Sequence, residues 1–280
     1  MDKIIYADKE EFNKKLAAIK NSGKDNLHIV SDFDRTLTKV QHNGIKTQNS
    51  FFGLREGNYF GENFLKRDIE LYDKFYPVEI SIEYSHDDKF SAMQEWWEEY
   101  YDMVLDYDLT QDIIKDIAKN GKMHLRDNGE TFFKILSDNN IPILILSAGI
   151  GNVIEEYLKV KNLVTDNVHI ISNFYTFDEN GKANGYNKPL IHTMNKSEVI
   201  IRNYPYHEEV ENKKNIILLG DNINDVDMSE GMHHDNIIKI GFTYDKTEMV
   251  IDEFLNVYDV LITQDGDLDF VNELLKEIID

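Results

Sequence analysis

The sequence predicts an α/β fold with a doubly wound, mainly parallel sheet as its core and a helical cap inserted into it. Three observations lead to this prediction. Short apolar runs recur along the chain, helical stretches separate them, and one connection is far longer than a crossover between parallel strands requires. Strands covered on both faces appear as continuous apolar runs. Their alternation with helices is typical of a doubly wound sheet.

Six apolar runs are predicted to be the strands of this sheet. Each is too short for a typical buried helix, which favours a strand. In chain order the runs are LHIVSDF (27–33), IPILILSA (141–148), VHIIS (168–172), NIILLGD (215–221), NIIKIG (236–241) and YDVLIT (258–263).

Helices are predicted on either side of these strands. Phe12, Leu16 and Ile19 lie on one face of a helix that precedes the first strand and ends near Gly23. Two further helices are predicted from GNVIEEYL, which follows the second strand, and from VNELLKEIID at the end of the chain.

The connection between the first two strands predicts a separate domain. Parallel strands need a crossover of only about a dozen residues or somewhat more. Residues from about 44 to 125 instead hold charged and aromatic helical stretches, such as FSAMQEWWEEYYDMVL. We therefore assign residues 1–43 and 126–280 to the α/β core and residues 44–125 to a helical cap. The cap is expected over the carboxyl ends of the strands, where ligands bind in open α/β sheets.

Composition excludes several classes of function. The 280 residues include no cysteine, which rules out disulfides, zinc thiolate sites and thiol catalysis. The first residues lack the apolar core of a signal peptide, and no apolar run approaches the roughly 20 residues of a membrane span. The formal net charge of −22 would repel a nucleic-acid backbone. We expect a cytoplasmic protein, a monomer rather than an oligomer, without nucleic-acid or membrane partners.

Polar side chains of a particular kind fall at or near the predicted strand ends. They are Asp32 and Asp34 in DFDRTLT, Ser147 in SAGIGN, Lys196 in HTMNKSEVI, and Asp221 and Asp225 in GDNIND. If the strands are adjacent, these groups converge on one spot. Mg²⁺ prefers carboxylate oxygens and keeps places for water and a substrate phosphate, and a Gly-bearing loop at a helix start offers N–H groups to an anion. The sequence therefore predicts a Mg²⁺ site beside a phosphate-binding loop.

The lysine of this cluster has two candidates. Lys188 lies in the same region as Lys196 and is the alternative for the ammonium of the cleft. An unselected surface lysine would simply be solvated.

The order of these motifs resembles that of the haloacid dehalogenase superfamily of phosphohydrolases. Longer segments, including FYPVEI, EWW, SAGIGNVIEE and LIHTMNK, resemble the cytosolic 5′-nucleotidase III family, also called pyrimidine 5′-nucleotidases. The likeness covers most of the chain from about residue 27. It implies a Mg²⁺-dependent phosphatase for nucleoside 5′-monophosphates with a preference for pyrimidines.

The resemblance also implies a catalytic role for three residues. Asp32 would attack the phosphorus and become an aspartyl phosphate. Asp34 would protonate the leaving ribose oxygen and then deprotonate the water that cleaves the acyl phosphate. Lys196 would neutralise the nucleophile and the transferring phosphoryl group.

Ligand-binding roles follow from the same resemblance. Mg²⁺ would be held by Asp32, the backbone carbonyl of Asp34 and Asp221, with Asp225 beside it. The phosphate oxygens would be held by Ser147 and the N–H groups of Ala148 and Gly149.

The resemblance places the rest of the substrate against the cap. Glu79 in YPVEI matches an acid that contacts the base or sugar. Trp96 and Trp97 could stack on a base, although adjacent helical residues point in different directions, so we expect at least one to pack in the core. The family often has a small or hydroxyl-bearing residue where this chain has Tyr100, which leaves the base preference open.

Two other functions compete with the nucleotidase interpretation. A phosphatase for another small metabolite, such as phosphoserine, would share the DFD, SAG and GDNIND motifs, but EWW and LIHTMNK speak against it. A phosphate-sensing receiver module also groups acids, a hydroxyl and a lysine on a parallel sheet. Receivers are much shorter and lack a cap.

Overall fold

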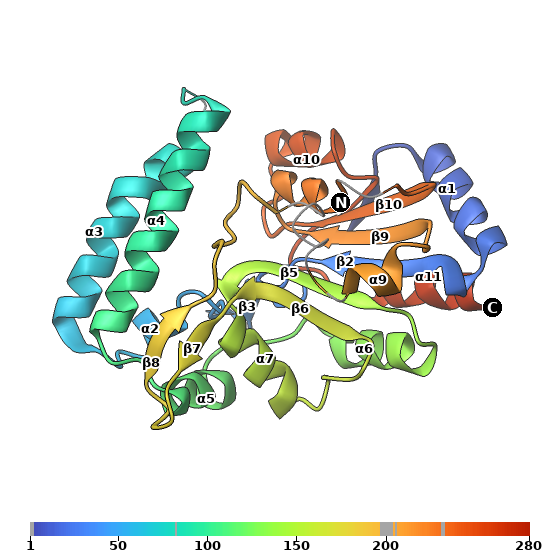
Figure 1. The fold of residues 1–280 in the computed structure, drawn as a ribbon. Helices are drawn as coiled ribbons and strands as arrows, with labels where there is room; N and C mark the ends of the chain where they lie inside the picture. Colours follow the sequence, from blue (N-terminus) through green and yellow to red (C-terminus); the bar gives the residue numbers. More distant parts are fainter. Residues whose placement is uncertain (1–2, 82, 197–203, 205, 231–232) are drawn as a thin grey trace.

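A seven-stranded sheet forms the centre of the structure, a computed structural model that describes residues 3–280 except 82, 197–203, 205 and 231–232 (Figure 1). Every neighbouring pair of strands is parallel except β1 and β11. The mainly parallel α/β sheet predicted from the sequence is therefore confirmed. Across the sheet the strands are β1 (Ile4–Tyr6), β11 (Val260–Ile262), β10 (Asn236–Phe242), β9 (Asn215–Gly220), β2 (Leu27–Ser31), β5 (Ile143–Ile150) and β6 (Val168–Asn173).

Helices cover both faces of this sheet, which explains why its strands are apolar throughout. Successive residues of a strand point to opposite faces. Ile29 accordingly packs in the cluster under α1, α6 and α11, whereas Val30 packs in the cluster under α9 and α10. The helices of the core are α1 (Lys9–Ser22), α6 (Gly129–Asp138), α7 (Gly151–Val160), α9 (Tyr206–Val210), α10 (Glu248–Leu255) and α11 (Asp269–Ile279).

Helix α1 shows how local sequence sets these elements. The Asp8 carboxylate accepts hydrogen bonds from the N–H groups of the first turn, and Gly23 ends the helix with φ at 79°. Phe12, Leu16 and Ile19 are buried between these ends. The predicted helix and its end at Gly23 are confirmed, as are the predicted helices that coincide with α7 and α11.

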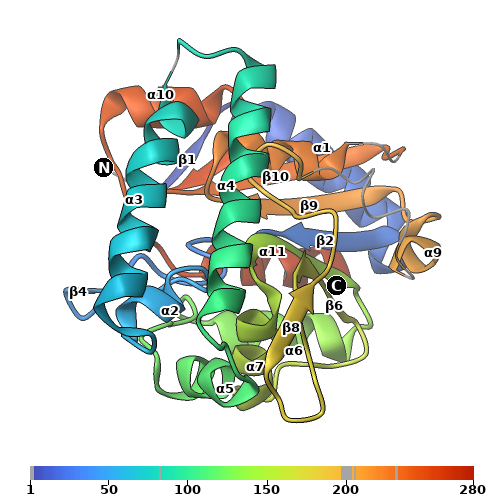
Figure 2. The same ribbon diagram turned by 60° about the vertical axis from the view of Figure 1, so that its left-hand side comes forward.

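A pair of long helices stands beside the carboxyl ends of the strands (Figures 1 and 2). They are α3 (Gly61–Ile80) and α4 (His86–Asp106), which pack along one another. None of the described helices is long and apolar enough to cross a bilayer. The cap boundaries at 44 and 125 stay a prediction, and α5 (Gln111–Asn120), inside that range, packs against α7 of the core.

Short elements fill the connections. One hairpin, β7 with β8, lies beside α4 and was not predicted from the sequence. The short elements are β3 (Gln41–His42), β4 (Ile45–Lys46), α2 (Gly53–Glu56), β7 (Tyr175–Phe177), β8 (Ala183–Tyr186) and two 3₁₀ helices, η1 (Lys24–Asn26) and η2 (Ile223–Ser229).

The buried guanidinium of Arg126 holds the loop that follows β2. Arg126 is 2 % exposed and donates to the Thr36 carbonyl at 2.7 Å, the Gly266 carbonyl at 2.6 Å and the Asp265 carboxylate at 3.1 Å. It also donates to the carbonyl of Arg35, whose φ is 65°. Arg126 thus ties this loop to the segment after β11. It fixes the backbone just past the two acids that follow β2.

Candidate active site

Strand order brings three of the predicted motifs together. β2 lies between β9 and β5, and all three run parallel. Asp32 follows β2, Asp221 follows β9, and Ser147 lies near the end of β5. Because the carboxyl ends of parallel strands meet at one edge of the sheet, these residues face the same space.

Three carboxylates and one ammonium form the centre of the site. One oxygen each from Asp32, Asp221 and Asp225 lies within 4.8 Å of the others. The Lys196 Nζ donates to Asp32 Oδ1 at 2.5 Å and to Asp225 Oδ1 at 3.0 Å. Lys188 is exposed, with its Nζ 5.5 Å from the centroid of the Tyr186 ring. Of the two candidate lysines, Lys196 is therefore the one beside the acids. The sequence also places Lys196 close to the start of a helix, but residues 197–203 lie outside the described part of the chain.

Burial makes this cluster electrostatically costly. Burial raises the pKa of Asp32 to about 6, even though the Lys196 charge lowers it. Burial, Asp32 and Asp225 together raise the pKa of Asp221 well above its ordinary value. Burial lowers the pKa of Lys196, but the charges of Asp225 and Asp32 outweigh burial and raise it overall. One ammonium therefore does not offset three carboxylates, of which Asp32 and Asp225 are buried and Asp221 is half-buried.

The donor set fits a hard divalent cation. Mg²⁺ takes oxygen ligands, usually only one or two of them carboxylates, and it would reverse the repulsion among these acids. Asp225 is already engaged, since its Oδ2 accepts the N–H groups of Asp221 and Asn222 at 3.0 Å and its Oδ1 accepts from Lys196. Asp32 Oδ1 accepts from Lys196 and Asp221 Oδ1 from Thr36, but among the described residues no donor bonds to the Oδ2 of either, so both could bind such an ion.

Asp34 has a different environment from Asp32. Its Oδ1 accepts the backbone N–H of Ser50 at 2.8 Å, and its Oδ2 accepts the hydroxyl of Ser50. Burial raises the pKa of Asp34, and the two bonds from Ser50 partly offset that effect. A carboxyl with a raised pKa that lines a cleft is suited to general acid–base chemistry.

The loop Ser147–Ala148–Gly149 is held by donors from α4 and β6. The Ala148 carbonyl accepts from Trp97 Nε1 at 2.9 Å and Asn173 Nδ2 at 3.0 Å. The Gly149 carbonyl accepts from the Tyr101 hydroxyl at 3.2 Å, among other donors. These contacts fix the loop whose N–H groups were predicted to bind phosphate.

One cleft joins the acidic cluster to the cap, with a volume of about 690 Å³. Asp32, Asp34, Lys196, Asp221 and Asp225 line it together with the loop at 147–149. A nucleotide-sized ligand fits a cleft of this volume.

Six aromatic side chains, which we call the aromatic wall, line the cap side of this cleft. Neighbouring members touch, with ring centroids 4.7–6.4 Å apart. They are Phe51, Phe52, Tyr72, Tyr76, Trp96 and Trp97.

Glu79 joins the aromatic wall in lining the cleft. It lies at the end of α3, and burial raises the pKa of its carboxyl. Trp96 and Trp97 are buried to about the same extent and both reach the cleft, so neither packs only in the core. Tyr100 does not line the cleft, since it is fully buried behind Phe51.

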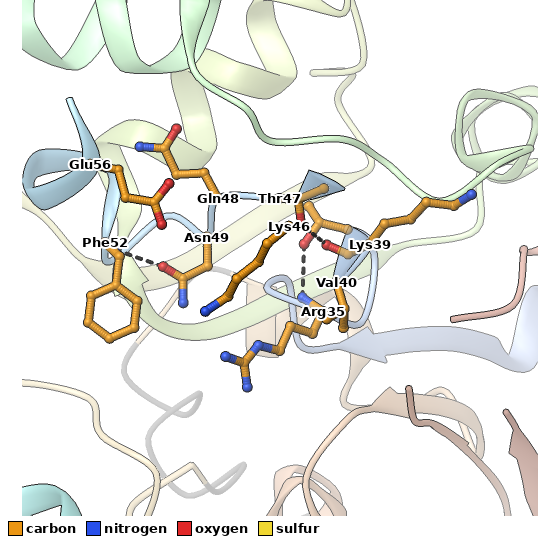
Figure 3. Close-up of a pocket in the computed structure, with 10 residues that line it drawn as sticks. Arg35, Lys39, Val40, Lys46, Thr47, Gln48, Asn49, Phe52 and Glu56 are labelled. Carbon is orange, nitrogen blue, oxygen red and sulfur yellow. Dashed lines mark hydrogen bonds between the residues drawn. The ribbon is translucent and has the colours of Figure 1, made fainter. Parts of the chain in front are cut away.

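A second pocket adjoins the cleft but is much smaller (Figure 3). Its volume is about 30 Å³, enough for about one water. Arg35 lines both spaces, while the Lys39 side chain points away and pairs with Asp127 at 2.5 Å. Of these two spaces, the large cleft is the one with room for a nucleotide.

Several residues of the site were missed by sequence reasoning. Ser50 binds Asp34 across sixteen residues of sequence, and the Thr36 hydroxyl donates to Asp221 at 3.4 Å. Trp97 was expected to contact the base or pack in the core, but Trp97 and Tyr101 both hold the carbonyls of the loop at 147–149. No local pattern marks Ser50. Thr36 could have been found from its place in DFDRT.

Comparisons with known proteins identify relatives of this chain. A family profile described as pyrimidine 5′-nucleotidase (UMPH-1) matches residues 35–279. The match begins directly after Asp34 and so does not include Asp32 or Asp34. A 7-methylguanosine phosphate-specific 5′-nucleotidase of Mus musculus is 36 % identical over 94 % of this chain and 88 % of its own length. A protein so named from Xenopus laevis is 34 % identical over 98 % of this chain and 95 % of its own length.

A similar 5′-nucleotidase is also found among solved structures. Cytosolic 5′-nucleotidase IIIB bound to cytidine has a TM-score of 0.89 and 31 % identity, and the match covers 99 % of this chain and 93 % of that one. A substrate-bound phosphoserine phosphatase has a TM-score of 0.53 and 15 % identity, covering 88 % and 96 % of the two chains, which shows the fold alone. The resemblance predicted from the sequence motifs is confirmed.

Gly149→Ala is expected to displace Asp34, the predicted acid–base residue, through Ser50. A Cβ at this position would lie 2.0 Å from Ser50 Oγ and 3.0 Å from Asp34 Oδ2. Since a misplacement of about 1 Å can lower a rate by on the order of 10²-fold, kcat/KM should fall by at least about tenfold. Steady-state kinetics on a phosphate ester measures this. The double variant Ser50→Ala/Gly149→Ala removes the clashing hydroxyl and should recover part of the loss. An unchanged kcat/KM in Gly149→Ala would contradict the expectation that a Cβ at this position displaces Ser50 and Asp34.

His192 is expected to make the stability of the fold depend on acid pH. It is fully buried, packs on Phe90 and Trp97 of α4, and burial lowers its pKa from 6.5 to about 4. Below pH 6.5 the unfolded chain takes up a proton that the folded protein refuses. The contribution of neutral His192 to the free energy of unfolding is therefore complete above pH 6.5. It is lost as the pH falls toward 4, which lowers the free energy of unfolding by roughly 3 kcal/mol.

Urea unfolding at several pH values tests this dependence. Between pH 6.5 and 4, His192→Asn should lose less free energy of unfolding than the wild type. His233→Asn, at a side chain that is 83 % exposed, serves as the control and should follow the wild type. Equal losses in wild type and His192→Asn would refute the assignment.

Proposed function

The chain belongs to the pyrimidine 5′-nucleotidase family, and on this premise we propose that it hydrolyses nucleoside 5′-monophosphates through an aspartyl-phosphate intermediate with the help of Mg²⁺. As a member of this family it is a 5′-nucleotidase and hence a phosphomonoester hydrolase. The observation that carries the mechanistic proposal is the buried contact of Lys196 with Asp32, next to Asp221.

Asp32 is the proposed nucleophile. Its Oδ1 is held by Lys196, and its backbone N–H donates to the Leu219 carbonyl at 3.0 Å, so its position relative to the cleft is fixed. Attack on phosphorus forms the acyl phosphate and breaks the bond to the ribose oxygen. Asp34 gives its proton to that oxygen and later takes one from the water that cleaves the acyl phosphate.

The phosphoryl group is proposed to be held by three groups of the chain. The Ser147 hydroxyl and the N–H groups of Ala148 and Gly149 would donate to its oxygens. Lys196 would neutralise the charge that Asp32 and the phosphoryl group share.

Mg²⁺ is the proposed cofactor. When bound, it would supply positive charge to the transferring phosphoryl group. Asp32, the Asp34 carbonyl and Asp221 would hold it, with Asp225 beside it keeping Lys196 and the backbone of Asp221 in place. The role of Asp225 is thus mainly one of position.

The substrate base is proposed to lie against the aromatic wall, with Glu79 as its polar contact. We propose a preference for pyrimidines, supported by the family profile and by the cytidine bound to the similar cytosolic 5′-nucleotidase IIIB. A second candidate is 7-methylguanosine monophosphate, because relatives at 34–36 % identity are named for that substrate. Cytoplasmic location and a monomeric state stay predictions.

A phosphate-release panel tests this proposal. Nucleoside 5′-monophosphates of cytidine, uridine and 7-methylguanosine are compared with phosphoserine, with Mg²⁺ and after chelation. We expect release from a nucleotide that disappears on chelation and falls on the order of 10³-fold or more in Asp32→Asn. Release that persists in Asp32→Asn would refute the mechanism. Activity on phosphoserine alone would refute the substrate class.

A further inference from the structure

We propose that the ion pair of Arg55 and Asp68 positions the aromatic wall and thereby determines how tightly the base of the substrate is held. This inference rests on the proposed function, because it assigns a task in binding the nucleotide. Arg55 does not line the cleft, so it would be a positioning residue that acts through the rings in front of it.

The geometry places Arg55 directly behind two members of the wall. Its Cζ lies 4.4 Å from the centroid of the Phe52 ring and 5.5 Å from that of Tyr72. Phe52 and Tyr72 both line the cleft, and their rings meet edge to face with centroids 6.4 Å apart. A guanidinium over two aromatic rings attracts both and restricts their rotation.

Asp68 fixes the plane of that guanidinium. It accepts from both Nε and Nη2 of Arg55, the latter bond being 2.8 Å, and it is only 2 % exposed. Asp68 and Tyr72 are four residues apart on α3 and therefore share one face of the helix. The pair thus links α2, which follows Phe52, to the face of α3 that carries Tyr72.

The chemistry of the pair favours a geometric task over a stabilising one. Asp68 is buried and Arg55 only half-buried, and such an ion pair contributes little net stability because desolvation offsets the attraction. Its two parallel hydrogen bonds nevertheless set one orientation, which a lysine cannot reproduce. Tyr100 acts similarly on the neighbouring ring, since its hydroxyl donates to the Phe51 carbonyl at 3.2 Å and its ring stacks on Phe51.

The test compares a substrate that has a base with one that lacks it. KM and kcat are measured for cytidine 5′-monophosphate, or 7-methylguanosine 5′-monophosphate if that is hydrolysed better, and for ribose 5-phosphate. The variants are Arg55→Lys and the milder Asp68→Asn. Arg67→Lys is the matched control, because Arg67 is next to Asp68 on α3, pairs with Asp106 at 3.5 Å and lies over the ring of Tyr107, which does not line the cleft.

We expect both variants to raise KM for the nucleotide by about tenfold while KM for ribose 5-phosphate and kcat stay within about twofold. Arg67→Lys should leave both KM values unchanged. Equal changes for the two substrates would overturn the inference, as would loss of the folded state in both variants, measured by circular dichroism, with Arg67→Lys folded. If the wild type hydrolyses no nucleotide, the proposed function fails instead, independently of Arg55.

Discussion

The bridge from Lys196 to Asp32 and Asp225 is the interaction on which the rest of the site depends. It joins the segment that follows β8 to the ends of β2 and β9. Without the ammonium, three carboxylates, two of them buried, would repel one another at close range. With it, the cluster still carries an excess of negative charge. A divalent cation is the natural counterpart of that excess, and an anionic phosphate the natural next ligand.

The surrounding structure serves to hold those groups in place. Hydrogen bonds from Asp221 and Asn222 fix Asp225, and the guanidinium of Arg126 fixes the backbone after Asp34. Hydrogen-bond donors from α4 orient the carbonyls of the loop at 147–149. The same helix also supplies part of the aromatic wall. Helix α4 therefore contacts both the loop at 147–149 and the part of the cleft proposed to hold the base.

Much of the core could be predicted because its causes are local. Burial on both faces made the strands β2, β5 and β9 continuously apolar, and the parallel arrangement then placed Asp32, Ser147 and Asp221 at one edge. β1 escaped prediction, since three residues of an antiparallel edge strand give no periodicity to detect. The hairpin of β7 and β8 was also not predicted, because its strands of three and four residues are too short to show a periodic pattern.

Contacts between distant segments could not be inferred from the sequence. Arg126 and Asp265 are separated by 139 residues, and no sequence pattern at either position predicts that the two side chains pair. Ser50 lies in the connection whose path depends on how the cap packs. The choice between Lys188 and Lys196 likewise needed coordinates, because both lie in one segment between β8 and α9. The order of the motifs was enough to predict a phosphatase, whereas the contacts of the motif residues with distant segments could be seen only in the folded structure.

Calorimetric titration with Mg²⁺ tests the central claim most directly, because it measures the ion without depending on turnover. Wild type is compared with Asp221→Asn and with Asp227→Asn, an exposed acid in η2 outside the cluster. Wild type and Asp227→Asn should each bind one Mg²⁺ per chain, and Asp221→Asn should bind it at least about tenfold more weakly. Equal binding by Asp221→Asn and wild type, or no binding by either, would contradict the central claim.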